Sequence, residues 1–251
     1  MIRNIDPIKL ALATSGKVDI KIGDYVNRSF SIFGQHWKNF VLFTIVSMLL
    51  TLVSAITIVG PYLLMFPLIM GYSNVIDKIE NGQSYEFNDF FIGLKKWTSF
   101  IPLFILIILS VIVFCVPVGV IMGSMFSIVE NNEEVAPFLG LSLFIIFPVM
   151  MFVGIFLSII CHLVPYFIYH GNLGAVKSLK ISYKVVKNNL WYMLLFVILF
   201  SIISQIGVYL CLIGIFASIP IGYILSYLMF KDLFLVDGKN EIDTIGQSTE
   251  L

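Results

Sequence analysis

The sequence has few charged residues, and those few avoid its long apolar stretches. Only 12% of the 251 residues are Asp, Glu, Lys or Arg, whereas 59% are hydrophobic. A chain this apolar has too few polar residues for the surface of one soluble domain, so that class is excluded. The formal net charge is zero, which gives no indication of nucleic-acid binding. We therefore predict a protein that buries its apolar excess in lipid and has no nucleic-acid partner.

Signatures of soluble catalytic and cofactor sites are also missing. The chain has no Walker phosphate loop, nucleophile elbow, His-Glu zinc helix or dinucleotide glycine fingerprint. Its three cysteines, Cys115, Cys161 and Cys211, are isolated in apolar runs, and we interpret them as small buried hydrophobes. His36 and His170 are predicted to be solvated or at headgroup level, without a second metal ligand. We expect no enzyme activity, no cofactor and no metal site.

Six apolar stretches are present instead, and a membrane-spanning helix needs about 20 such residues. They cover residues 39–58, 61–77, 98–125, 136–169, 190–213 and 214–236. All fifteen Lys and Arg residues lie on alternate segments between these stretches or near the chain ends. This one-sided distribution is typical of a multi-pass protein whose basic segments stay in the cytoplasm. We predict an all-α protein with six transmembrane helices in a bacterial inner membrane, with both termini cytoplasmic.

The ends of the chain are predicted to lie outside a single membrane domain at residues 22–236. Residues 1–21 and 237–251 are expected to be flexible cytoplasmic segments. Residues 1–36 contain no continuous apolar run of the kind found in a signal peptide. The first span is therefore expected to act as an uncleaved insertion signal.

An amphipathic segment precedes each pair of apolar stretches, with apolar residues at helical spacing. Trp37, Trp97 and Trp191 each lie where such a segment passes into a span, and indole rings prefer the headgroup level. We predict three interfacial helices anchored by these tryptophans. The pattern also suggests three parallel repeats of an interfacial helix plus a hairpin, at residues 22–77, 85–169 and 173–236. The alternative is that any six-span protein with short external loops looks like this without repetition.

The third amphipathic segment gives the strongest functional signal. Its polar stripe contains no acidic residue and consists of Lys177, Lys180, Lys184 and Lys187. Val176 and Tyr183 belong to its apolar stripe. Near an anionic membrane surface each such cation is attracted by about 1 kcal/mol, so the lysines are a candidate site for anionic lipid. The alternative is that they only set the orientation of the protein.

Small residues recur at intervals of four along two of the spans. They are Gly214, Ser218, Gly222 and Ser226 in the last span, and Gly119 and Gly123 in the third. Helices in lipid approach closely where side chains are small, so we predict helix-packing surfaces here. The same ridges would equally serve contacts in a homo-oligomer or with another membrane protein.

Two strongly polar residues, His162 and Gln205, lie deep within the predicted spans. Polar side chains at this depth are costly, and they usually hydrogen-bond across helices or mark a functional site. We predict that these two bond to each other in a structural contact. The alternative is that His162 binds a ligand or carries a proton.

Four stretches carry a resemblance to a known family: residues 29–40 (SFSIFGQHWKNF), 66–72 (FPLIMGY), 88–95 (NDFFIGLK) and 213–223 (IGIFASIPIGY). They resemble a bacterial multi-pass family related to the membrane domain fused to some glycerophosphodiester phosphodiesterases. In that family the phosphodiesterase chemistry belongs to a separate soluble domain, which is not among these 251 residues. The resemblance therefore implies a six-helix membrane partner, scaffold or regulator, and no catalytic residues.

We interpret the sequence as a non-catalytic structural, scaffold or regulatory membrane module that contacts lipids and a membrane partner or a second copy. The alternative is a transporter or channel for an apolar or amphiphilic solute. A cavity lined by His162, Gln205, Tyr166 or Asn74 would favour that alternative. A lipid-modifying enzyme would instead need a polar cluster at the cytoplasmic interface, which the sequence does not reveal.

Overall fold

The computed structural model describes residues 5–18, 20–57, 59–131, 136–209 and 214–236. Its elements are α1 (Pro7–Ser15), α2 (Ile22–Ser54), α3 (Gly60–Glu80), the 3₁₀ helix η1 (Phe87–Phe100), α4 (Ile101–Asn131), α5 (Ala136–Tyr169), α6 (Ala175–Asn188), α7 (Leu190–Tyr209) and α8 (Ile215–Phe234). The one strand-like contact in these ranges is an isolated bridge between Ile5 and Leu235. The all-α prediction is confirmed for the part of the chain that the structure describes.

Four described helices are long and apolar enough to cross a membrane: Ile22–Ser54, Phe87–Ser124, Phe147–Tyr169 and Leu190–Tyr209. Helices α3 and α8 occupy the second and sixth predicted stretches, with 21 and 20 residues. At 1.5 Å per residue each is about 30 Å long, but each ends in charged residues. A membrane protein with several apolar helices is therefore supported, whereas six spans and three repeats stay predictions.

The first predicted interfacial helix and the first span form one continuous helix. Helix α2 runs through Trp37 for 33 residues. The predicted passage from interfacial helix to span at Trp37 is therefore not marked by a break in the helix, because no proline interrupts residues 22–54 and the nearby Asn39 side chain bonds elsewhere. Asn39 donates a hydrogen bond of 3.1 Å to the hydroxyl of Tyr85 instead of capping a helix end.

The helix is interrupted at the other two points where an amphipathic segment passes into a predicted span. Lys96, beside Trp97, has non-helical backbone angles (φ −110°, ψ 18°) where η1 passes toward α4. Asn189 separates α6 from α7 just before Trp191. All three tryptophans are exposed, and their place at the headgroup level stays a prediction.

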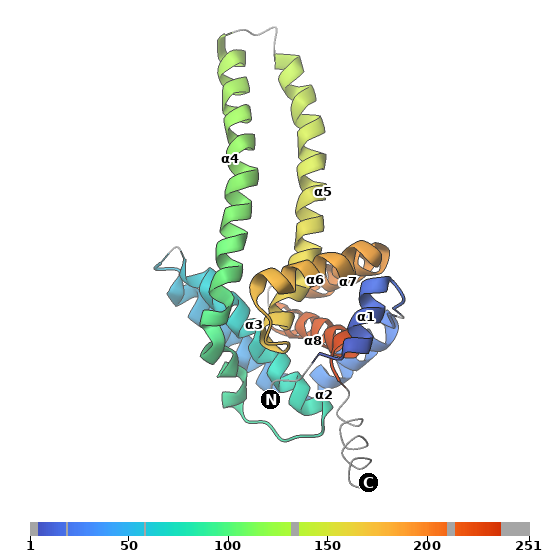
Figure 1. Cartoon of the computed structure of the whole chain (residues 1–251). Helices are drawn as coiled ribbons and strands as arrows, with labels where there is room; N and C mark the ends of the chain where they lie inside the picture. The colour runs from blue at the N-terminus through green and yellow to red at the C-terminus, as the bar shows by residue number, and fades with distance from the viewer. Residues whose placement is uncertain (1–4, 19, 58, 132–135, 210–213, 237–251) are drawn as a thin grey trace.

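Helix α8 lies at the centre of the packed helices, with α2 and α7 against it (Figure 1). Almost every side chain from residue 220 to 234 is buried. Such burial is expected of a helix that is hydrophobic all round. The ring of Phe230 lies 5.2 Å from Tyr166 and 5.1 Å from both Phe167 and Phe234. Helices α4 and α5 rise away from this group as a long hairpin (Figure 1).

Helices α3 and η1 touch through their backbones at two glycines. A Cβ atom added to Gly71 would lie 1.9 Å from the carbonyl oxygen of Phe90. A Cβ atom on Gly93 would lie 2.0 Å from the carbonyl oxygen of Pro67. Only glycine permits this approach, which fixes α3 beside η1 and therefore orients the face of α3 that meets the other helices.

The four stretches that carry the family resemblance converge on one aromatic cluster, although they are far apart in the sequence. The ring of Phe90 lies 5.5 Å from Phe40 and 4.5 Å from Phe43. Tyr72 lies 4.8 Å from Phe43 and 5.0 Å from Tyr223. Because aromatic pairs at these distances add about 0.5–1.5 kcal/mol each beyond burial, this cluster holds α2, α3, η1 and α8 together.

The described part of the N-terminal segment packs against the ends of α6 and α8, whereas the flexibility predicted for residues 1–21 stays a prediction. Asp6 caps α1 by accepting hydrogen bonds from the amides of Ile8 and Lys9. The Lys9 ammonium donates to the carbonyl oxygen of Leu235 at 2.9 Å. Asn189 donates to the carbonyl oxygen of Ala13 at 2.7 Å. These long-range bonds leave no signal in the local sequence. Residues 1–4, 19 and 237–251, including the predicted flexible tail, lie outside the described residues.

Candidate functional site

A cavity of about 410 Å³ lies between α3, α4, α5, α7 and α8. Aromatic and aliphatic side chains form most of its wall, among them Phe66, Phe104 and Phe200. Its size falls within the range of about 300–1,000 Å³ that is usual for small-molecule sites. At its mouth the side chains of Tyr62 and Met65 are 57% and 49% exposed. The cavity is therefore open toward the molecular surface beside the first half of α3.

Helix α5 supplies the polar corner of this cavity. Ser158, His162 and Tyr166 recur at intervals of four, which places them on one helical face. His162 Nε2 lies 3.0 Å from the hydroxyl of Ser226 on α8, and its ring packs 4.8 Å from Phe200. A hydrogen bond of this kind satisfies a polar ring that would otherwise be costly at bilayer depth.

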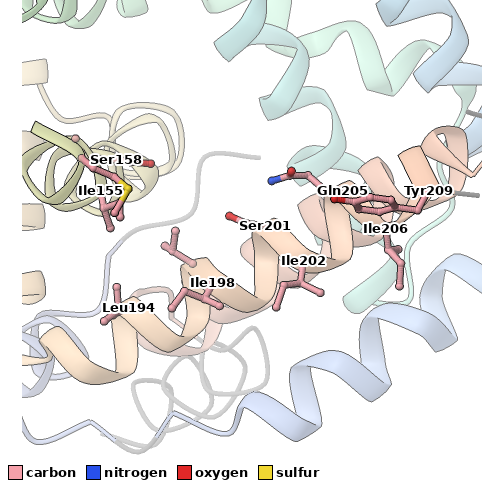
Figure 2. A pocket seen from close by; sticks show the side chains of 12 residues that line it. Ile155, Ser158, Leu194, Ile198, Ser201, Ile202, Gln205, Ile206 and Tyr209 are labelled. Carbon is pink, nitrogen blue, oxygen red and sulfur yellow. The ribbon is translucent and has the colours of Figure 1, made fainter. Parts of the chain in front are cut away.

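The predicted hydrogen bond between His162 and Gln205 is replaced by the bond from His162 to Ser226. Gln205 instead lines a separate groove of about 700 Å³ between α5 and α7. Figure 2 shows Ser201 and Gln205 on the same side of α7, with Ser158 on the neighbouring element. Gln205 does not reach His162 because α7 is rotated about its axis so that its small-residue face meets α8.

The small-residue ridge of the last span meets α7 and α5 inside the chain; it consists of Gly214, Ser218, Gly222 and Ser226. Ser218 donates to the carbonyl oxygen of Ser204 at 2.9 Å. A Cβ on Gly222 would lie 2.2 Å from the Ser204 hydroxyl oxygen, and one on Gly207 would lie 2.3 Å from the Ser218 hydroxyl oxygen. The ridge is therefore used within the fold and is not free for a second copy.

The predicted packing of Gly119 and Gly123 on α4 is not formed. A Cβ added to either glycine would meet no described atom within 4 Å. The physical reason is that α4 leaves the packed helices and rises with α5 as a long hairpin (Figure 1).

Helix α6 exposes the four predicted lysines, Lys177, Lys180, Lys184 and Lys187. Its opposite face, including Ser178 and Val185, is buried against neighbouring helices. Val176 and Tyr183 were predicted to share the apolar stripe, but both are about half exposed, beside the lysines. None of the ion pairs among the described residues involves these lysines.

An ionic cluster that the sequence interpretation missed joins the ends of α2, α3 and α8. Arg28 pairs with Asp232 at 3.1 Å and also with Glu80. Lys231 lies 3.4 Å from Glu80, and their side chains are only 8% and 16% exposed. Nearby, the hydroxyl of Tyr227 donates to Asp77 at 2.7 Å. The sequence signal for this cluster was a charged residue at one end of each of three apolar helices. That these helix ends meet depends on the tertiary fold.

His170 was predicted to be solvated, and this is wrong because the residue is only 1% exposed. Its Nε2 atom lies 3.0 Å from the hydroxyl of Ser73, which is equally buried. His36, by contrast, is half-buried and lies 3.0 Å from the hydroxyl of Tyr85. Asn74 donates to the carbonyl oxygen of Asp89 at the contact between α3 and η1, outside the cavity.

Cys161 is a free, half-buried thiol at the cavity wall. The predictions for Cys115 and Cys211 concern side chains outside the described part of the chain. Within that part, no group of three His, Cys, Asp or Glu residues is arranged to hold a metal ion.

No family model matches this chain, and neither a curated protein nor a solved structure is similar enough to it to count as a match. Functional reasoning therefore rests on the geometry alone. That geometry offers an apolar cavity with a polar corner and an exposed cationic helix.

Proposed function

We propose that the chain is a six-span protein of a bacterial inner membrane that acts as a non-catalytic structural or regulatory module. Its contact with the cytoplasmic leaflet is made through anionic lipid on α6. The observation that carries the proposal is the set of four lysines exposed on one face of α6 while the other face is packed. A cationic surface helix of this kind attracts anionic headgroups.

The half-exposed Val176 and Tyr183 support the same proposal. A helix that lies in the membrane interface inserts apolar side chains among the headgroups while its lysines reach the phosphates. Lysines that only set the orientation of the protein would not need exposed apolar side chains beside them.

The proposed orientation places both termini in the cytoplasm. It is supported by the contact between α1 and the end of α8, where the amide of Asp6 donates to the carbonyl oxygen of Phe234 at 2.8 Å. It is also supported by the contact of α1 with the end of α6, which puts the basic helix on the same side. A chain that crosses the membrane an even number of times has both termini on the same side, and six is an even number.

Membership in the family named above is likewise a proposal, which rests on the four stretches quoted for the resemblance. A scaffold of this kind would bind a membrane-protein partner or a second copy through a surface other than the ridge of α8, because α7 and α5 already cover that ridge.

The test replaces Lys177, Lys180, Lys184 and Lys187 together with glutamine. The purified variant is expected to carry several-fold less phosphatidylglycerol by mass spectrometry, at unchanged helicity. The matched control replaces four exposed lysines outside α6: Lys17, Lys21, Lys38 and Lys95. Equal lipid content in both variants would show that α6 has no special role and would overturn the proposal.

A second candidate function is a carrier for an amphiphilic solute, and the cavity lined by His162 and Tyr166 favours it. Flux of a fluorescent fatty alcohol across proteoliposomes separates the candidates. Flux above that of protein-free liposomes supports the carrier, whereas its absence supports the module.

A further inference from the structure

We propose that the chain binds an uncharged, hydroxyl-bearing two-chain lipid of the diacylglycerol class in the cavity beside α3. This inference goes beyond the lipid contact on α6, because it concerns a different surface and a lipid of different charge.

The first argument is the pairing of two cavities. The 410 Å³ cavity lies on one side of the first half of α3, and a second cavity of about 610 Å³ lies on the other side, against α2 and α8. The two share Tyr62, Met65, Ile69 and Tyr223. Two adjoining apolar spaces suit two acyl chains that lie on either side of one helix.

The second argument is charge. No Lys, Arg, Asp or Glu lines either cavity. A phosphate or carboxylate brought to this depth would have no cation to neutralise it, and an unpaired charge in such surroundings is strongly disfavoured. The lining therefore selects an uncharged headgroup.

The third argument is a free hydrogen-bonding group at the junction. Tyr223 lines both cavities, and its hydroxyl forms no hydrogen bond with any residue that the structure describes. Beside it, the Ser226 hydroxyl lies 3.0 Å from His162 Nε2. A glycerol hydroxyl or ester carbonyl at this point would satisfy Tyr223, which its position otherwise leaves without a partner.

The occupant enters from the surrounding bilayer. Tyr62 and Met65 are about half exposed at the shared mouth, whereas the second half of α3, from residue 70 to 77, is buried. The first half of α3 is thus flanked by open space, and the lipid that surrounds a membrane protein is the molecule at hand to fill it.

The experiment uses the full chain in nanodiscs that contain phosphatidylethanolamine and phosphatidylglycerol. A trace of diazirine-bearing diacylglycerol is added in one arm, and phosphatidic acid with the same chains in the other. After illumination, labelled peptides are mapped by mass spectrometry. The diacylglycerol probe is expected to label residues 61–69 and 158–166 several-fold more than phosphatidic acid does. Equal labelling by both probes would mean that ordinary lipid tails fill the space, and would overturn the proposal.

Two variants with matched controls complete the test. Tyr223→Phe removes only the hydroxyl and is expected to weaken specific labelling about fivefold, as for one lost hydrogen bond. Tyr209→Phe, in the groove between α5 and α7, is expected to leave it unchanged. Ile107→Phe adds bulk at the cavity wall and is expected to abolish the labelling, whereas Ile198→Phe in the other groove is not. Loss of labelling in both members of a pair would contradict the assigned site.

Because the lysines of α6 take no part in these cavities, the quadruple glutamine variant is expected to keep its diacylglycerol labelling. Loss of anionic lipid with retained labelling supports both ideas. Failure of one experiment alone overturns only the corresponding idea.

Discussion

Replacement of Gly71 by alanine tests the close contact on which the position of α3 depends. The new Cβ would lie 1.9 Å from the carbonyl oxygen of Phe90, where ordinary contact begins at 3.4 Å. Helix α3 and η1 must therefore separate by about 1.5 Å, and because the obstacle is backbone, no rotamer change relieves it. Overpacking commonly costs about 1–3 kcal/mol, and this case belongs at the upper end.

The matched control is Gly34→Ala in the middle of α2, where an added Cβ meets nothing within 4 Å. Alanine in an open helical position stabilises by about 0.5–1 kcal/mol relative to glycine. The two variants should thus differ by about 4 kcal/mol. At about 2–4 °C per kcal/mol for a chain of this length, their midpoints should differ by about 8–16 °C.

Thermal unfolding in detergent, followed by tryptophan fluorescence, measures both midpoints. Gly93→Ala, which would place a Cβ 2.0 Å from the carbonyl oxygen of Pro67, should resemble Gly71→Ala. Since either substitution already separates the two helices, the double variant should cost less than the sum of the single ones. If Gly71→Ala and Gly34→Ala melt together, the backbone contact between α3 and η1 does not exist and the reasoning is refuted.

Three further predictions concern the ionic cluster, the polar corner and the threading. Glu80→Gln removes the carboxylate shared by Lys231, which is 8% exposed, and Arg28, which is 30% exposed and keeps its pair with Asp232. It should lower the free energy of unfolding by about 2–3 kcal/mol, less than for a fully buried pair because the site keeps some solvent. Asp24→Asn, at an exposed pair, should cost under about 0.5 kcal/mol in the same chemical denaturation series, and equal losses would contradict the cluster. Ser226→Ala should destabilise the protein by about 1–3 kcal/mol, because it leaves the His162 imidazole unpaired. Gln205→Ala in the open groove should change the unfolding midpoint little. The reverse order of the two losses would exclude the observed pairing. Single cysteines introduced at residues 60, 132 and 212 should react with an impermeant maleimide on intact cells, and protection of any of them would rule out the six-span threading.

The aromatic cluster shows how the sequence pattern and the fold are connected. Phe40, Tyr72, Phe90 and Tyr223 come from the four stretches on which the family resemblance was noted. In the sequence these stretches are separate, weakly specific apolar motifs. Their convergence gives each a common physical role, because together they join α2, α3, η1 and α8 into one unit.

A lipid-modifying enzyme would need a polar cluster at the cytoplasmic interface, and the sequence did not reveal one. The ionic cluster is a group of charged residues at the ends of α2, α3 and α8. Its members pair with one another, and the nearby Ser73 and His170 are only 1% exposed. The cluster is best explained as a clamp between three helices.

Composition and periodicity alone determined that this protein is helical and apolar enough for a membrane, because both properties are summed over short segments. They also located α6 and its lysines, since the exposed face of an amphipathic helix follows from residue spacing. Tertiary structure alone decided that His162 pairs with Ser226, that His170 is buried and that α1 is docked. Each of these depends on how a helix is rotated about its axis and on which distant segment lies against it, and in this chain glycine contacts and aromatic packing between α2, α3, η1, α7 and α8 set both.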